Sequence, residues 1–317
     1  MTFRILADES VEEAVQRIAR EQLDSAIDEI NDQGLNRHVV VHQVRKRCKK
    51  IRGLVRLVRP QFEDAYDHEN AWYRDAAQRL SYVRDAQSSI DTFDKIMDHF
   101  QDQIDHKAFA PVRKRLTNRR KQVAKDEAGL RERLDVFRER LHEGRERVAA
   151  WRLREKGFSA VQGGLTKTYA RGCTAMTKAY QNPSTENFHE WRKGVKYHWY
   201  HMRLLQSVWQ EPMQARCDAA DLLSDYLGDD HDLSILRETL LDRPADFGDE
   251  ATLQALLGLL TQRQVELRAQ AKWLGVRLYA EKPQRFSKRL HSYWNAWRSG
   301  VETELQTTRE PESITIC

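Results

Sequence analysis

Two stretches of the chain place a histidine, an arginine and two lysines at the same four offsets, 0, 3, 4 and 7. The first stretch, HQVRKRCKK, begins at His42, and the second, HEWRKGVKY, begins at His189. In a helix these offsets lie along one face. Arginine can grip two phosphate oxygens, lysine supplies a compact point charge, and a nearby phosphate favours charged histidine. The pattern therefore predicts a site for a phosphate-rich polyanion.

The helix that carries the first motif has a polar face that consists almost entirely of cations. Residues 37–59 contain nine Lys or Arg residues and no acid. Like charges at i and i+4 destabilise an isolated helix, so a solvated face normally intersperses acids. For one such helix, ordinary charged surface is the better explanation, but a second copy in register with the histidine retained favours an external polyanion. The candidate residues of this face are His42, Arg45, Lys46, Lys49, Arg52 and Arg56.

The motif belongs to an internal repeat, because His189 follows His42 by 147 residues and the same offset relates many other positions. A constant offset over more than forty residues indicates one helical unit of about 150 residues that is present twice. Trp199 stands where the first copy has Arg52, so the two faces differ there. The pairs related by this offset include Arg45 and Arg192, Lys46 and Lys193, Lys49 and Lys196, Arg56 and Arg203, Leu80 and Leu227, and Asp85 and Asp232. The candidate residues of the second face are His189, Arg192, Lys193, Lys196, Tyr200 and Arg203.

Helices must position these residues, because good helix formers dominate the chain and breakers are few. Of the 317 residues, 40% are hydrophobic, 32% are charged and only seven are proline. Breaks are expected at Pro60, at Gly163–Gly164, and just before Asp85 and Asp232, which would cap a helix or bind a nearby cation. The apolar spacing predicts helices over about 10–30, 36–59, 63–86, from 91 onward, 111–156, 166–180, 184–209, 213–227, 233–242, 250–275 and 283–307.

Charge and cysteine distribution narrow the classes of function. The net charge is only +5, but acids concentrate in residues 1–36 and 218–232, which indicates a positive field on one surface. The four cysteines have no metal-type spacing and point to a reducing cytosol. The N-terminus has no secretory h-region, and no stretch approaches 18 apolar residues. We therefore expect a cytoplasmic protein with no cofactor and no membrane partner.

The double motif resembles the CHAD family, the conserved-histidine α-helical domains. HxxRKxxK recurs near the start of two helices, and LSYVRDA and LGDDHDL follow the two copies. The resemblance covers residues 8–307 as one domain and implies an all-α fold, two pseudo-twofold-related four-helix bundles with long helices. Repeat one would span 8–156 and repeat two 160–307, and the aperiodic residues 308–317 would be a frayed tail. The resemblance also implies inorganic polyphosphate as the partner, held in a basic groove by His42, Arg45, Lys49, Arg52, His189, Arg192 and Lys196.

Non-enzymatic binding of polyphosphate is the leading interpretation, and association with polyphosphate granules is a further hypothesis. RNA binding in the same groove is the alternative, but the basic face offers only Tyr200 and marginal Trp199 for base stacking. A phosphohydrolase is the third alternative, but there is no P-loop, no GxSxG and no carboxylate row beside the cations. The GDDHD cluster is a weak metal pattern, because the first copy keeps only one of its ligands, and no metal site is predicted. Arg119 and Arg120, in the basic run 113–125, are added as candidate groove residues, and the oligomeric state stays open.

Overall fold

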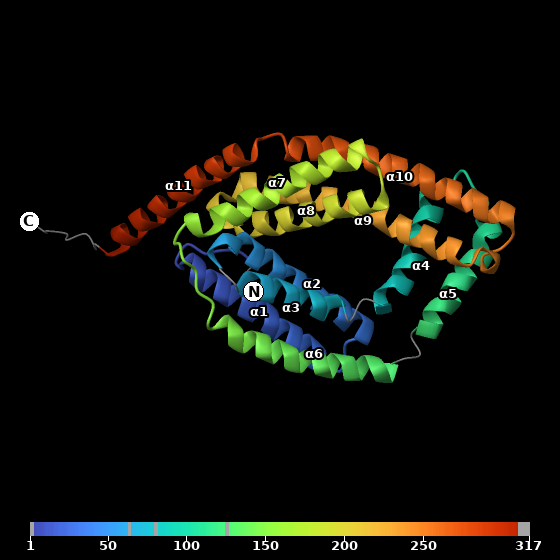
Figure 1. Cartoon of the computed structure of the whole chain (residues 1–317), viewed down its shortest axis with the longest axis horizontal. Helices are drawn as coiled ribbons and strands as arrows, with labels where there is room; N and C mark the ends of the chain where they lie inside the picture. Colours follow the sequence, from blue (N-terminus) through green and yellow to red (C-terminus); the bar gives the residue numbers. More distant parts are fainter. Residues whose placement is uncertain (1–2, 63–64, 79–81, 124–126, 310–317) are drawn as a thin grey trace, which may run out of the picture.

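Long runs of helix-forming residues between few breakers form helices throughout the part of the chain that can be described. The computed structural model describes residues 3–62, 65–78, 82–123 and 127–309, and within these ranges there is no strand. The predicted all-α class is therefore confirmed (Figure 1). The helices are α1 (Val11–Asn31), α2 (Arg37–Leu57), α3 (Ala65–Gln78), α4 (Tyr82–His99), α5 (Ala110–Val123), α6 (Glu127–Val148), α7 (Ser159–Gln181), α8 (Thr185–Leu204), α9 (Gln210–Asp242), α10 (Glu250–Leu278) and α11 (Pro283–Arg309), with 3₁₀ turns at Arg59–Gln61, His106–Phe109, Gln206–Val208 and Pro244–Asp246.

Polar caps set the starts of the helices that carry the motifs. The Asn36 side chain accepts a hydrogen bond from the His38 backbone N–H, and α2 begins at the next residue, Arg37. The Ser184 side chain accepts from the Asn187 backbone N–H at the start of α8. Because both helices begin within one residue of equivalent places in the repeat, the two motif histidines lie in the second turn of their helices.

Two of the predicted breaks are wrong. Gly163–Gly164 lies inside α7, where the absence of a side chain lets this helix cross the end of α2 closely. A Cβ on Gly164 would lie only 2.0 Å from the Leu57 carbonyl oxygen. Residues 213–227 and 233–242 form parts of one continuous helix, α9, so Asp232 is not a cap. Without proline between them, nothing interrupts the backbone hydrogen bonds.

The predicted helix over 111–156 corresponds to α5, described to Val123, and to α6, from Glu127 to Val148, with residues 124–126 outside the described ones. In the first repeat, Asp85 lies within α4. The hydrogen bond predicted for it involves its own side chain, which is not among the described ones. Leu80 and the end of the predicted tail, 310–317, also lie outside the described residues.

Apolar side chains gather in two cores. The larger core joins helices of both repeats, from α1, α2, α3 and α6 to α7, α8 and α11, with one end each of α9 and α10. The smaller core packs α4 and α5 of the first repeat against the other ends of α9 and α10 (Figure 1). The repeats are thus joined at both cores, and the pseudo-twofold arrangement of two bundles stays a prediction.

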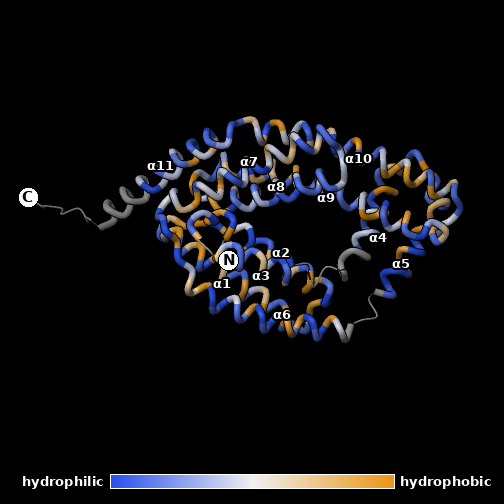
Figure 2. The backbone as a smooth tube through the Cα atoms, in the orientation of Figure 1, coloured by the Kyte–Doolittle hydropathy of each residue, from blue (hydrophilic) through white to orange (hydrophobic). Residues whose placement is uncertain are grey.

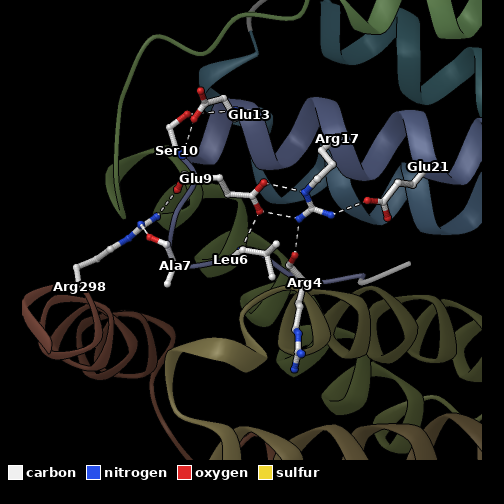
Figure 3. Close-up of polar contacts among 9 residues, drawn as sticks. All are labelled: Arg4, Leu6, Ala7, Glu9, Ser10, Glu13, Arg17, Glu21 and Arg298. Atoms are coloured by element: carbon white, nitrogen blue, oxygen red, sulfur yellow. Dashed lines mark hydrogen bonds and ion pairs between the residues drawn. The ribbon is translucent and has the colours of Figure 1, made fainter. Parts of the chain in front are cut away.

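The segment before α1 ties the two ends of the described chain together (Figure 3). Ile5 donates its N–H to the Leu204 carbonyl at the end of α8, at 2.9 Å. Arg17 of α1 forms a two-pronged ion pair with Glu9. From α11, Arg298 donates to the backbone carbonyls of Ala7 and Glu9. This segment therefore fixes α1, α8 and α11 relative to one another.

Each helix carries both hydrophobic and hydrophilic residues along its length, and no helix is apolar throughout among those drawn in colour (Figure 2). In agreement with this, none of the described helices combines the length and the apolar character that a membrane span requires.

Candidate functional site

A cavity of about 480 Å³ lies between the cation-bearing faces of α2 and α8. We call it the basic cavity, because eight Arg and Lys side chains line it and Asp232 is the carboxylate among its lining residues. The α2 wall consists of Arg45, Lys49, Arg52 and Arg56, the α8 wall of His189, Arg192, Lys193, Lys196, Tyr197 and Tyr200, and the remaining lining residues are Ser88, Arg171, His231, Asp232 and Ile235.

The cations of both walls face the cavity because the opposite helix faces are buried in the larger core. On α2 the apolar residues Val44, Ile51 and Val55 are fully buried. On α8, Trp191 and Val195 are likewise fully buried. Burial of each such side chain contributes about 1.5–3 kcal/mol, so rotating either helix to hide its cations would lose this free energy. The sidedness predicted from the helical pattern is therefore observed.

The α2 wall places two arginines side by side on uncharged partners. Arg52 Nε and Arg56 Nη2 both donate to Asn70 Oδ1 of α3, at 3.3 and 3.1 Å. Both guanidinium groups also lie over the Tyr197 ring, with Cζ 5.8 Å (Arg52) and 4.2 Å (Arg56) from its centroid. Burial lowers the pKa of Arg52 from its ordinary value, but an arginine this basic stays charged. The two positive groups are thus oriented by neutral partners.

On the α8 wall, carboxylates contact the cations. Glu190 forms ion pairs with Lys193 and, at 2.9 Å, with Arg171 of α7. Lys196 lies 3.4 Å from Asp221 of α9 and 3.9 Å from the centroid of the Trp199 ring. Burial lowers the pKa of Lys196, and Asp221 partly opposes that shift.

Two histidines meet at one end of the cavity. The rings of His189 on α8 and His231 on α9 are tilted against each other, with centroids 4.3 Å apart. Burial, with smaller contributions from His231 and the nearby Lys193 and Arg192, lowers the pKa of His189 to about 4. Burial also lowers the pKa of His231. Both rings are therefore neutral at pH 7 when the cavity holds no anion.

The structure brings nine of the fourteen predicted residues to the basic cavity. His42 and Lys46 are exposed on α2 and are not among the lining residues. Arg203 instead lies over the Trp199 ring, 5.0 Å from its centroid. Arg120 donates to Gln87 Oε1 at 3.0 Å, and Arg119 is exposed. A binding role stays a prediction for all fourteen residues. The nine are Arg45, Lys49, Arg52, Arg56, His189, Arg192, Lys193, Lys196 and Tyr200.

Sequence reasoning missed several lining residues that the fold supplies from other elements. Tyr197 follows Lys196 and sits beneath two arginines of the α2 wall. His231 lies in the acidic segment LGDDHDL, which follows the second motif as LSYVRDA follows the first. This correspondence within the repeat was a usable signal. Arg171 comes from α7, and its place beside Glu190 could be found only in the folded chain.

The other acids of the GDDHD segment contact cations of neighbouring helices. Asp229 accepts from Lys95 of α4 at 2.9 Å. Asp230 is almost fully buried and is bound by Arg268 of α10 at 2.6 Å. Burial raises the pKa of Asp230, and the bond from Arg268 opposes that shift. These two acids join α9 to α4 and α10 rather than facing the basic cavity.

A search of curated proteins finds no match to this chain. The family model of the CHAD domain matches residues 17–241, which is more than two-thirds of the sequence. The matched span contains both histidine motifs, α2, α8 and nearly all of α9, and so includes every residue that lines the basic cavity. The chain therefore belongs to the CHAD domain family.

Proposed function

We propose that this protein is a non-enzymatic module that binds inorganic polyphosphate in the basic cavity. The observation that carries the proposal is the convergence of eight Arg and Lys side chains from α2, α7 and α8 on one cavity of about 480 Å³. A chain of phosphates offers closely spaced negative charges and oxygen acceptors, which match arginine forks and lysine point charges. The family to which the chain belongs is linked to polyphosphate binding.

The aromatic residues at the cavity favour polyphosphate over RNA. Proteins that bind single-stranded RNA stack unpaired bases on accessible aromatic rings. Here Tyr200 is 2% exposed and Trp199 is 9% exposed. Lys196 and Arg203 lie over the Trp199 ring, and Arg56 lies over Tyr197. Because cations or neighbouring side chains cover these rings, the cavity suits an anion that has no bases.

Calorimetric titration with long-chain polyphosphate, repeated at several salt concentrations, tests the proposal directly. Affinity should fall steeply and linearly with log salt concentration, because cavity cations release the counterions of the bound polyanion. Single-stranded RNA of matched charge should compete weakly, and incubation with Mg²⁺ or Mn²⁺ should release no phosphate. An affinity that is unchanged between low and moderate salt would contradict a cation-lined site. Preferential binding of RNA would support the alternative function instead.

Polyphosphate binding should strengthen as the pH falls. The pKa of His189 is about 4 in the unliganded protein. Bound phosphates favour imidazolium and raise this pKa, so the complex binds more protons than the free protein between the two values. Affinity therefore rises as pH falls through the pKa in the complex, and the contribution of His189 levels off below about 4.

Titrations across this range with a His189→Gln variant measure the effect, and the variant should have a flatter pH dependence. His142→Gln, which removes an exposed histidine of α6, is the matched control and should keep the full slope. If His189→Gln also keeps the full slope, the protons are taken up elsewhere.

A further inference from the structure

Two arginines of the α2 wall differ from two lysines of the α8 wall in their partners. Residues 37–59, which include the α2 wall, contain no acid, and Arg52 and Arg56 share a neutral asparagine. Within the described ranges, neither of these two arginines is paired with a carboxylate. The α8 wall instead has carboxylates within ion-pair distance of Lys193 and Lys196.

We infer that Glu190 and Asp221 are built-in counter-anions that determine which phosphate ligands the α8 wall accepts. Glu190 occupies Lys193 and Arg171, and Asp221 occupies Lys196. A ligand must displace these carboxylates to reach the three cations, whereas it reaches Arg52 and Arg56 without displacing a carboxylate of the described chain. This inference rests on the polyphosphate binding proposed above.

The competition favours long ligands, because a group that is already tethered has a high effective concentration. A small phosphate from solution must compete with two tethered carboxylates and gains little at the α8 wall. A long chain that is anchored on Arg52 and Arg56 is itself tethered, so its next phosphates compete on equal terms. Arg52 and Arg56 would therefore anchor phosphates of any length, and the paired cations on the opposite side would select for chain length.

Both ion pairs are well placed for such exchange. The side chains of Lys193 and Glu190 are 41% and 45% exposed, and those of Lys196 and Asp221 are 32% and 46% exposed. Ion pairs with this much solvent contact contribute little to stability, so an incoming polyanion can replace them at small cost. Fully buried pairs would instead behave as fixed structural elements.

The experiment compares the unmodified protein with Glu190→Gln, Asp221→Asn and the double variant, each titrated with long-chain polyphosphate and with pyrophosphate. Each substitution should strengthen long-chain binding about two- to fivefold, the range expected for losing competition from a solvent-exposed ion pair. The salt dependence should become steeper, because salt weakens the internal ion pair as well as ligand binding, and the two effects partly cancel in the unmodified protein. The unmodified protein should bind one equivalent of pyrophosphate, and the double variant should bind two.

Asp218→Asn is the matched control, because Asp218 lies one turn before Asp221 on α9 and accepts a hydrogen bond from Gln214 rather than from a cavity cation. It removes the same charge and should leave both ligands' affinities within twofold of the unmodified protein. Equal gains from Asp218→Asn, or no gain from Glu190→Gln and Asp221→Asn, would overturn the inference. If the unmodified protein does not bind long-chain polyphosphate, the proposed function itself fails, and that titration shows it separately.

Discussion

Long-chain polyphosphate should bind the Arg52→Gln, Arg56→Gln double variant at least about thirtyfold more weakly than the unmodified protein. Each lost charge-assisted hydrogen bond to a phosphate oxygen costs about 1–3 kcal/mol, and two such losses give a factor of about thirty or more. The effect should be large because these two arginines converge on one point, where Asn70 and Tyr197 orient them. Calorimetric titration of both proteins at one salt concentration measures the difference.

A control variant must separate these contacts from the loss of net charge. Arg37→Gln with Arg59→Gln removes two charges from the same segment, at residues that are neither candidate binding residues nor part of the lining of the basic cavity. This control should weaken binding only a few-fold, through the long-range field. Because glutamine can still donate to Asn70, the site variant should keep the urea midpoint of the unmodified protein. If the control loses as much affinity as the site variant, charge rather than contact determines binding.

Gly164→Ala should destabilise the protein by about 3 kcal/mol, near the upper end of the usual cost of overpacking. The added Cβ would lie 2.0 Å from the Leu57 carbonyl oxygen and 2.3 Å from that of Arg56. Both neighbours are backbone atoms, so α7 must move away from the end of α2 to make room. Urea unfolding, with stability extrapolated to water, measures the loss.

Gly258→Ala provides the matched comparison, because it places the same methyl group on exposed α10 with nothing within 4 Å. Alanine is favoured over glycine within a helix, so this variant should be about 0.5–1 kcal/mol more stable than the unmodified protein. If Gly164→Ala is stabilising to the same extent, the close crossing of α7 and α2 does not contribute as described. Since Arg56 lies at this crossing, a weaker affinity in the folded fraction of Gly164→Ala is also expected.

The sequence predicted the helices well where local chemistry decides them, and less well where contacts between helices do. Pro60 correctly indicated the end of α2, and Ser10 caps α1 where the apolar spacing predicted a helix from about residue 10. The break predicted at Gly163–Gly164 was wrong because glycine occurs both where a helix ends and where two helices cross closely. Only the position of Leu57 in the fold shows that the second case applies. The break before Asp232 was wrong because α9 packs against α4, α8 and α10, which keeps it helical past Gly228.

For the candidate site, too, the sequence predicted what depends on one helix and missed what depends on contacts between helices. Helical periodicity placed Arg45, Lys49 and Arg192 on polar faces, and the resemblance to the CHAD family implied that the two faces would meet in a groove. It could not show that Asp221 would reach Lys196, because these residues lie on different helices. Nor could it show that burial would hold His189 neutral, since desolvation depends on how α8 and α9 pack.

The smaller core has a consequence for synthesis on the ribosome. Phe93 and Phe100 of α4 are buried in the smaller core, to which α9 and α10 contribute much of the apolar surface. Lys95 and its partner Asp229 are separated by 134 residues. At roughly 5–20 residues per second, α4 waits about 7–27 s for this partner after it has been made. Each nascent chain therefore carries an uncovered apolar hairpin during that interval, and we expect molecular chaperones to bind there first.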